Sequence, residues 1–97
     1  MWVLRTEEGA EPSFTFRILP GNIKTVGRAT RADFAVDAAL VSRIHCRLTA
    51  GHEKVEVEDL ASTNGTFVND KRVERAQLAN GDRLRVGRIE LKVALDG

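Results

Sequence analysis

This sequence lacks disulfide pairs, tyrosine and a strong charge of either sign: it has one cysteine, no tyrosine, and 15 basic against 14 acidic residues. A single cysteine, Cys46, cannot form an intramolecular disulfide, and small secreted domains often depend on such bonds. We therefore expect an intracellular protein, cytoplasmic or, in a eukaryote, nuclear. The net charge of +1 gives no global field that would attract nucleic acid or an anionic membrane, so any anion site has to be local.

Long apolar runs are also missing. No stretch approaches the ~20 residues that span a bilayer, and residues 1–5 have neither a basic leader nor an extended apolar segment. We expect no membrane anchor and no export signal. The aromatic residues are one tryptophan and four phenylalanines, too few for the stacking surface of a nucleic-acid-binding barrel. The 97 residues suffice for one hydrophobic core, so we expect a single domain over residues 1–97, which a longer protein could contain.

What the sequence does have is alternation of apolar and polar residues with a period of two, which is typical of half-buried strands. It predicts strands at residues 14–18, 46–50, 54–58, 83–86 and 89–95, and a further strand is expected at residues 23–26, before Gly27. Turn formers such as Pro20-Gly21 and Asn80-Gly81 separate them. Residues 70–79 have helix-forming composition but no apolar stripe, so we assign them to strand and loop. Many short strands with frequent turns indicate an all-β sandwich or barrel.

Three clusters of polar residues lie in the predicted connections: Gly27-Arg28, Ser42 to His45, and Ser62 to Thr66. Binding residues are often found on loops that a rigid sheet positions. Each cluster alone has an ordinary structural explanation. Gly27 can end a strand, Arg28 can be a solvated charge, and Asn64-Gly65 is typical of a tight hairpin turn.

Taken together and in this order, the clusters resemble the forkhead-associated (FHA) domain. The matching blocks are Val26-Gly27-Arg28, Asp33 to Asp37, Val41 to Cys46, Asp59 to Asn69 and Leu78 to Asp82. The resemblance implies an FHA/SMAD-like, two-sheet β-sandwich of about eleven short strands with its binding loops at one end. It also implies a module that binds a phosphothreonine-containing peptide, with neither enzymatic activity nor a cofactor.

The same resemblance suggests the phosphopeptide-binding residues. A phosphate monoester carries roughly −1.5 to −2 charges and three acceptor oxygens, which suits an arginine fork and fixed hydroxyl or N–H donors. Arg28 is expected to contact the phosphate, Ser42 to give it a hydroxyl hydrogen bond, and Thr63 to add a donor. Arg43 could use its backbone N–H, its guanidinium or both. Asn64 is expected to hydrogen-bond the ligand's backbone.

Structural support of the site is expected from Gly27 and Gly65, which would permit the backbone turns, and from His45, which in the family braces the loop holding the serine. Ser42 with His45 also suggests a nucleophile and base, but no orienting carboxylate or oxyanion motif accompanies them. A metal site on His45, Cys46 and His52 is disfavoured, because adjacent strand residues point to opposite faces. Cys46 is expected to pack in the core.

The resulting hypothesis is a monomeric phosphothreonine reader that recruits its host protein to kinase-phosphorylated targets. Family members often carry a polar or proline-containing turn before the serine, where this chain has Leu40, so we expect an apolar wall there that alters the preference for flanking ligand residues. The alternative is a phosphate-independent scaffold or self-association domain on the same fold. A nucleic-acid-binding barrel is the weaker third reading, and no metal is expected.

Overall fold

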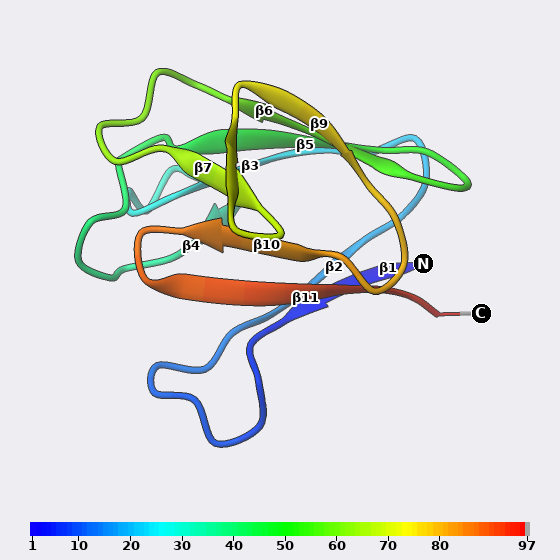
Figure 1. Ribbon diagram of the computed structural model, residues 1–97, viewed down its shortest axis with the longest axis horizontal. Coiled ribbons are helices and arrows are strands. Elements are labelled where there is room, and N and C mark those ends of the chain that lie inside the picture. The colour runs from blue at the N-terminus through cyan, green and yellow to red at the C-terminus, as the bar shows by residue number, and fades with distance from the viewer. Residues whose placement is uncertain (97) are drawn as a thin grey trace.

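The computed structural model describes residues 1–96 and is built from β-strands only, arranged in two facing sheets (Figure 1). The six-stranded sheet has the order β2-β1-β11-β10-β7-β8 and the five-stranded sheet the order β4-β3-β5-β6-β9. The strands are β1 Trp2–Arg5, β2 Thr15–Ile18, β3 Ile23–Gly27, β4 Phe34–Ala35, β5 Cys46–Ala50, β6 Val55–Asp59, β7 Thr66–Val68, β8 Lys71–Val73, β9 Arg75–Leu78, β10 Arg83–Val86 and β11 Ile89–Leu95. The expected eleven-stranded β-sandwich is confirmed.

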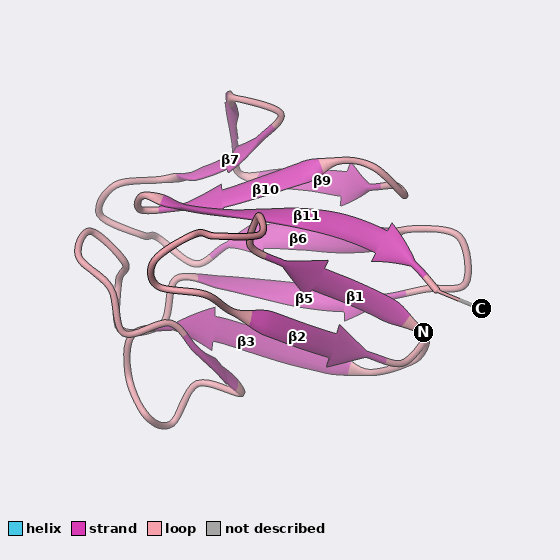
Figure 2. Ribbon diagram, turned by 90° about the horizontal axis from the view of Figure 1, so that it is seen from below, coloured by secondary structure: helices cyan, strands magenta, loops and turns pink. Residues whose placement is uncertain are grey.

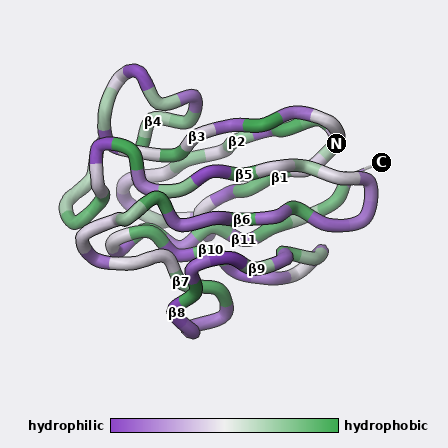
Figure 3. Tube along the Cα trace, turned by 90° about the horizontal axis from the view of Figure 1, so that it is seen from above, coloured by the Kyte–Doolittle hydropathy of each residue, from purple (hydrophilic) through white to green (hydrophobic). Residues whose placement is uncertain are grey.

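Alternation of apolar and polar residues explains strands β2, β5, β6, β10 and β11, and it is visible along β5 and β6 in Figure 3. It does not predict strand β1, because Trp2, Val3 and Leu4 are all buried and give no period of two. Strand β1 forms antiparallel pairs with both β2 and β11, so it lies inside the sheet, where buried neighbours remove the alternation. Residues 71–78 form β8 and β9, in agreement with the expected strand and loop.

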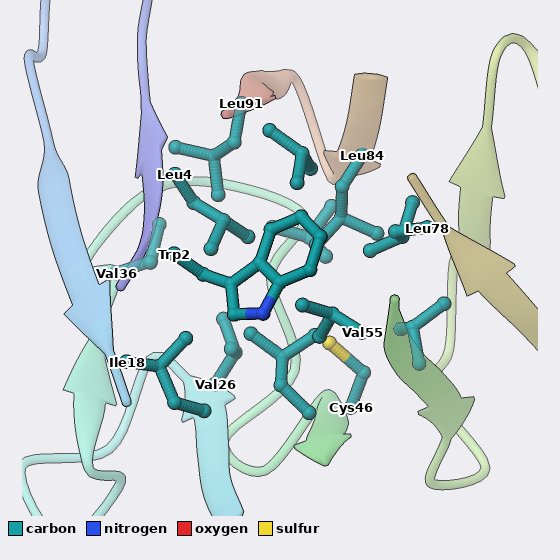
Figure 4. Close-up of a cluster of buried hydrophobic side chains, with 14 of the residues drawn as sticks. Trp2, Leu4, Ile18, Val26, Val36, Cys46, Val55, Leu78, Leu84 and Leu91 are labelled. Carbon is teal, nitrogen blue, oxygen red and sulfur yellow. The ribbon is translucent and has the colours of Figure 1, made fainter. Parts of the chain in front are cut away.

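The core lies between the two sheets, with Trp2 near its centre (Figure 4). Leu4, Leu84 and Leu91 of the six-stranded sheet are fully buried with it. The indole Nε1 of Trp2 donates a 2.8 Å hydrogen bond to the carbonyl oxygen of Gly51, so this buried polar atom has a partner. Cys46 is also fully buried, as expected.

Strand register brings the loops of interest to one end of the sandwich. Val26 pairs with Cys46, and Cys46 pairs with Asp59, so the end of β3, the start of β5 and the end of β6 are neighbours. The β3–β4, β4–β5 and β6–β7 loops therefore begin or end at the same edge of the five-stranded sheet. Figures 1 and 2 show this edge at the end of the molecule opposite the two chain termini.

Candidate functional site

The β4–β5 loop is held against the end of β3 by backbone hydrogen bonds. Arg28 N–H donates to the carbonyl oxygen of Ser42 at 2.9 Å, and Ala29 N–H donates to that of Arg43 at 3.0 Å. His45 N–H donates to the carbonyl oxygen of Val26 at 2.8 Å. A Cβ atom on Gly27 would lie 2.1 Å from the carbonyl oxygen of Arg43, so only glycine allows this approach. The short loop backbone thereby carries Ser42 to a position beside Arg28.

His45 connects this loop to the β6–β7 loop. Its side chain is fully buried, its Nδ1 accepts a 3.0 Å hydrogen bond from Ser42 N–H, and its Nε2 lies 2.8 Å from the carbonyl oxygen of Gly65. Because Nδ1 accepts, the proton sits on Nε2 and is donated to Gly65. Both ring nitrogens are therefore occupied by backbone groups, and neither faces the Ser42 hydroxyl as a general base would.

The β6–β7 loop is organised around Asp59, a residue to which the sequence analysis assigns no role. Its carboxylate accepts hydrogen bonds from the hydroxyls of Ser62 and Thr66 and from Ser62 N–H. The Ser62 hydroxyl oxygen in turn accepts from Gly65 N–H at 3.0 Å. Partial burial acts to raise the pKa of Asp59, but the hydrogen bonds from Ser62 and Thr66 outweigh it and the pKa is lowered. This loop is thus anchored by an ionised carboxylate.

Gly65 adopts a left-handed conformation, with φ of 92°. The alternative explanation of Asn64-Gly65 as a hairpin turn is wrong, because β6 and β7 belong to different sheets and do not pair with each other. A Cβ on Gly65 would also approach the Arg72 guanidinium, 2.8 Å from Nε. Gly65 lets the chain turn from one sheet to the other while its carbonyl oxygen meets His45.

An open groove lies where these loops meet. All five residues predicted to bind a phosphopeptide line it, together with Arg31, Leu40, Val41, Ile44 and Ala61. The five are Arg28, Ser42, Arg43, Thr63 and Asn64. Among the described residues, the lining contains three arginines and no carboxylate, so the groove is locally cationic although the chain is nearly neutral.

Hydrogen bonds within the protein fix the groove's polar side chains. The Ser42 hydroxyl oxygen accepts a 3.0 Å hydrogen bond from Thr63 N–H, which leaves its own proton to donate. Arg28 Nε donates to the carbonyl oxygen of Val41 at 3.1 Å and so orients the guanidinium plane. Asn64 Nδ2 donates to the carbonyl oxygen of Leu40 at 3.1 Å and ties the β6–β7 loop to the β4–β5 loop.

Two features of the lining go beyond the sequence analysis. Arg31 is not among the predicted residues; its position three residues after Arg28 in the same loop is the only signal that could have found it. Leu40 lies on the groove with 47% of its surface exposed and a φ of 69°, a conformation that side chains with a Cβ rarely adopt. No sequence pattern predicts that strained backbone.

The residues considered for metal binding or thiol chemistry do not form a site within the described residues. Within residues 1–96, no group of three His, Cys, Asp or Glu side chains is placed to hold a metal ion. Burial, with a smaller contribution from the nearby charge of Asp59, raises the pKa of the Cys46 thiol to about 12, so this thiol is neutral and unreactive in the native state. The described part of the chain contains no helix able to cross a membrane.

A model of the FHA domain family matches residues 24–87, which include every residue of the groove. The chain belongs to the FHA domain family. FHA domains are binding modules for phosphothreonine-containing peptides. The match covers β3 to β10 and hence all three loops that form the groove.

Relatives and solved structures agree with this membership. The chain is 39% identical over 80 residues to the ABC transporter ATP-binding/permease protein Rv1747 of Mycobacterium tuberculosis, covering 82% of this chain and 9% of that protein. It is 36% identical over 74 residues to the glycogen accumulation regulator GarA of the same species, covering 76% of this chain and 46% of GarA. The chain thus spans less than half the length of either relative.

Among solved structures, an FHA domain from an analysis of phosphothreonine-dependent FHA domain interactions superposes with a TM-score of 0.82. It is 32% identical to this chain, and the superposition covers 99% of this chain and 97% of that one. The likeness therefore extends beyond the family match at residues 24–87 to the N- and C-terminal strands.

Proposed function

We propose that this FHA domain is a non-enzymatic module whose cationic groove binds a phosphothreonine-containing segment of a partner protein. The observation that carries the proposal is the meeting of three arginines and several fixed donors in one groove whose described lining has no carboxylate. A phosphate monoester, with roughly −1.5 to −2 charges, supplies the complementary charge. The 32% identical FHA domain with phosphothreonine-dependent interactions supports the choice of phosphothreonine.

Arg28 is the residue best suited to grip the phosphate. The bond from its Nε to Val41 anchors one edge of the guanidinium and leaves the terminal amino groups for a ligand. The Ser42 hydroxyl lies in the same groove with its proton available, because the oxygen already accepts from Thr63 N–H. Together they offer a planar fork and a hydroxyl donor to one phosphate. Arg43 and Thr63 complete the set of donors.

Asn64 is suited to hold the peptide backbone rather than the phosphate. Its Nδ2 is engaged by the carbonyl oxygen of Leu40, which orients the amide and leaves Oδ1 as an acceptor for a ligand N–H. Leu40 places an exposed apolar side chain on the same groove. Asn64 would thus fix the register of the peptide backbone, and Leu40 would offer the peptide an apolar wall. This wall would favour an apolar ligand side chain near the phosphothreonine.

The affinity should be modest. Hydrogen bonds to charged groups are worth about 1.5–3 kcal/mol each, so three or four of them, less the entropy of ordering a short peptide, give about −8 kcal/mol, or low micromolar binding. Because the groove is open and part of the attraction is Coulombic, binding should weaken as salt is added.

The test compares matched threonine and phosphothreonine peptides by isothermal titration calorimetry. Wild type should bind only the phosphorylated peptide, and Arg28→Ala should lose about 10- to 100-fold in affinity, the equivalent of one or two charged hydrogen bonds. Lys54→Ala is the matched control, because Lys54 lies in the β5–β6 turn at the opposite end of the five-stranded sheet. Equal binding of the two peptides, or an unaffected Arg28→Ala variant, would overturn the proposal.

The same samples address the oligomeric state and the alternative function. We propose that the domain acts as a monomer in an intracellular compartment, and sedimentation with and without phosphopeptide checks the first part. A tight dimer that neither the peptide nor Arg28→Ala affects would favour a phosphate-independent self-association domain instead.

A further inference from the structure

The groove carries more positive charge than one phosphate balances. Arg28, Arg31 and Arg43 all line it, and within residues 1–96 none of the three forms an ion pair with a carboxylate. A phosphate monoester brings roughly −1.5 to −2 charges against these three cations. A bound phosphate therefore leaves about one positive charge of the groove without a counterpart.

The backbone at Arg31 is held firmly at the edge of the groove. Ala29 N–H donates to the carbonyl oxygen of Arg43, and Ala32 N–H donates to the carbonyl oxygen of Ala29, both at 3.0 Å. The second bond closes a tight turn with Arg31 at its third position. Ala32 is buried under the turn, whereas the side chain of Arg31 is exposed. The turn thus fixes where the guanidinium starts and leaves its donors to a ligand.

The acidic residues of the neighbouring loops do not neutralise Arg31. Asp33 lies two residues further along the same loop, but its carboxylate accepts hydrogen bonds from the N–H of Thr25 at 2.8 Å and from the hydroxyl of Thr25 at 3.1 Å. Asp59 is engaged by its own loop, as described above. Asp37 is exposed and lies outside the lining of the groove. A counter-charge for Arg31 therefore has to come from the ligand.

The strand order places Arg31 and Asn64 on opposite sides of the phosphate donors. In the five-stranded sheet, β3 and β4 lie on one side of β5, and β6 lies on the other. Arg31 belongs to the β3–β4 loop and Asn64 to the β6–β7 loop. Arg28 at the end of β3 and Ser42 in the β4–β5 loop lie between them. A peptide held by Asn64 on one side of its phosphothreonine would reach Arg31 on the other.

We propose that Arg31 is a specificity-determining residue that binds a carboxylate of the ligand, on the side of the phosphothreonine away from Asn64 and Leu40. The ligand is then a phosphothreonine segment with an aspartate or glutamate on one flank and an apolar residue on the other. This inference rests on the proposed phosphopeptide function of the groove and names the class of segment that it selects.

The charges favour a carboxylate over a second phosphate. A carboxylate brings one negative charge, which matches the cation that the phosphothreonine leaves unbalanced, and its two oxygens suit the planar fork of an arginine. A second phosphate would bring the total to about −3 to −4 against three cations.

The experiment is a double-mutant cycle between domain and peptide, measured by isothermal titration calorimetry. Phosphothreonine peptides carry either aspartate or asparagine at one position, which is moved from four residues before the phosphothreonine to four residues after it. Aspartate should raise the affinity of the wild type about three- to fivefold over asparagine on one flank only, as an exposed ion pair worth up to about 1 kcal/mol allows.

Variants of the domain assign this gain to one side chain. Arg31→Gln should abolish the gain from aspartate and bind the asparagine peptide within about twofold of the wild type, since the phosphate donors remain. Lys54→Gln is the matched control: it removes one cation at the opposite end of the five-stranded sheet, and the gain should persist.

Three outcomes would overturn the proposal. If Arg31→Gln weakens the aspartate and asparagine peptides by the same factor, Arg31 contacts the phosphate and no second subsite exists. An equal gain from aspartate on both flanks would mean diffuse attraction to a cationic groove. A second phosphothreonine that binds more than about tenfold tighter than aspartate at the same position would assign the subsite to phosphate.

The asparagine peptide separates this proposal from the function on which it rests. If the domain binds this peptide only when it is phosphorylated, and Arg28→Ala weakens that binding, the phosphopeptide function stands. Absence of any gain from aspartate would then refute the role of Arg31 alone. If none of the phosphorylated peptides binds, the phosphopeptide function itself is wrong.

Discussion

Gly27→Ala is the substitution whose effect can be worked out most directly from the structure. The added Cβ would lie 2.1 Å from the carbonyl oxygen of Arg43, 2.8 Å from its carbonyl carbon and 2.9 Å from the Cα of Ile44. All three are backbone atoms, so no side-chain rotation can relieve the contact. Since optimal separations are about 3.5–4.0 Å, the β4–β5 loop has to move by more than about 1 Å.

The magnitude follows from what that movement breaks. Overpacking costs about 1–3 kcal/mol, and each of the backbone hydrogen bonds that join Arg28 to Ser42 and Ala29 to Arg43 contributes about 1 kcal/mol. We expect Gly27→Ala to lose about 2–4 kcal/mol of unfolding free energy, or about 10–30 °C in melting temperature for a domain of this size. Phosphopeptide affinity should fall with it, because Ser42 is displaced.

Urea denaturation and a melting curve, run beside Gly21→Ala, test this reasoning. Gly21 has a φ of 92° and no atom within 4 Å of the position that a Cβ would take, so alanine there suffers backbone strain of about 1–2 kcal/mol without a clash. Gly27→Ala should be clearly more destabilising, and only it should weaken peptide binding. Comparable losses for the two variants, with peptide binding retained, would refute the claim that the loop is held by close backbone contact at Gly27.

Three further predictions concern Cys46, Asp59 and Lys92. The buried Cys46 thiol, with its pKa near 12, should react with Ellman's reagent at pH 8 only as fast as the domain unfolds, and reaction of the folded protein at the rate of a free thiol would contradict its burial. The pKa of Asp59 is lowered in the folded state, so its stabilising contribution is fully present above the ordinary pKa of aspartate and is lost as the pH falls through the pKa of the folded state. We expect Asp59→Asn to lose about 1–3 kcal/mol of unfolding free energy at neutral pH and less in acid. Urea titrations of both proteins from pH 7 to 3 measure this difference. Arg5 and Arg83 are the direct cross-strand partners of Lys92, so Lys92→Glu should gain about 0.2–1 kcal/mol by turning two like-charge pairs into opposite-charge pairs. A lower melting temperature would argue against repulsion between these partners.

Alternation predicted several strands whose two faces differ, and it missed strand β1, whose residues Trp2 to Leu4 are buried on both faces. Alternation located β5, β6, β10 and β11, because one side of each meets the core and the other meets solvent. Strand β1 is buried along Trp2 to Leu4, so period two disappears. The two-residue strand β4 is too short for any period to show. Assigning strands to sheets required the family resemblance, since pairing is a long-range property.

For the candidate site, the sequence predicted which residues take part, but it could not predict the contacts that position these residues. The five ligand-binding candidates line one groove, and their individual roles stay predictions until a complex is measured. The anchoring of a loop by Asp59 could not be predicted, because a carboxylate next to serine and threonine is common in ordinary turns. The left-handed backbone at Leu40 could not be predicted either, since leucine is an unfavourable residue for that conformation.

The groove's supporting residues and its ligand-contacting residues should differ in how stability and binding change together. Gly27 and His45 hold loops in place, so substitutions there should lower stability and affinity at once. Arg28 lines the groove with two other arginines, so removing its charge relieves repulsion in the free domain while it removes attraction for an anionic ligand. Across a set of variants, stability and binding should thus correlate positively at positioning residues and negatively at ligand-contacting ones. That sign separates a residue that shapes a site from one that touches the ligand, even before any complex is seen.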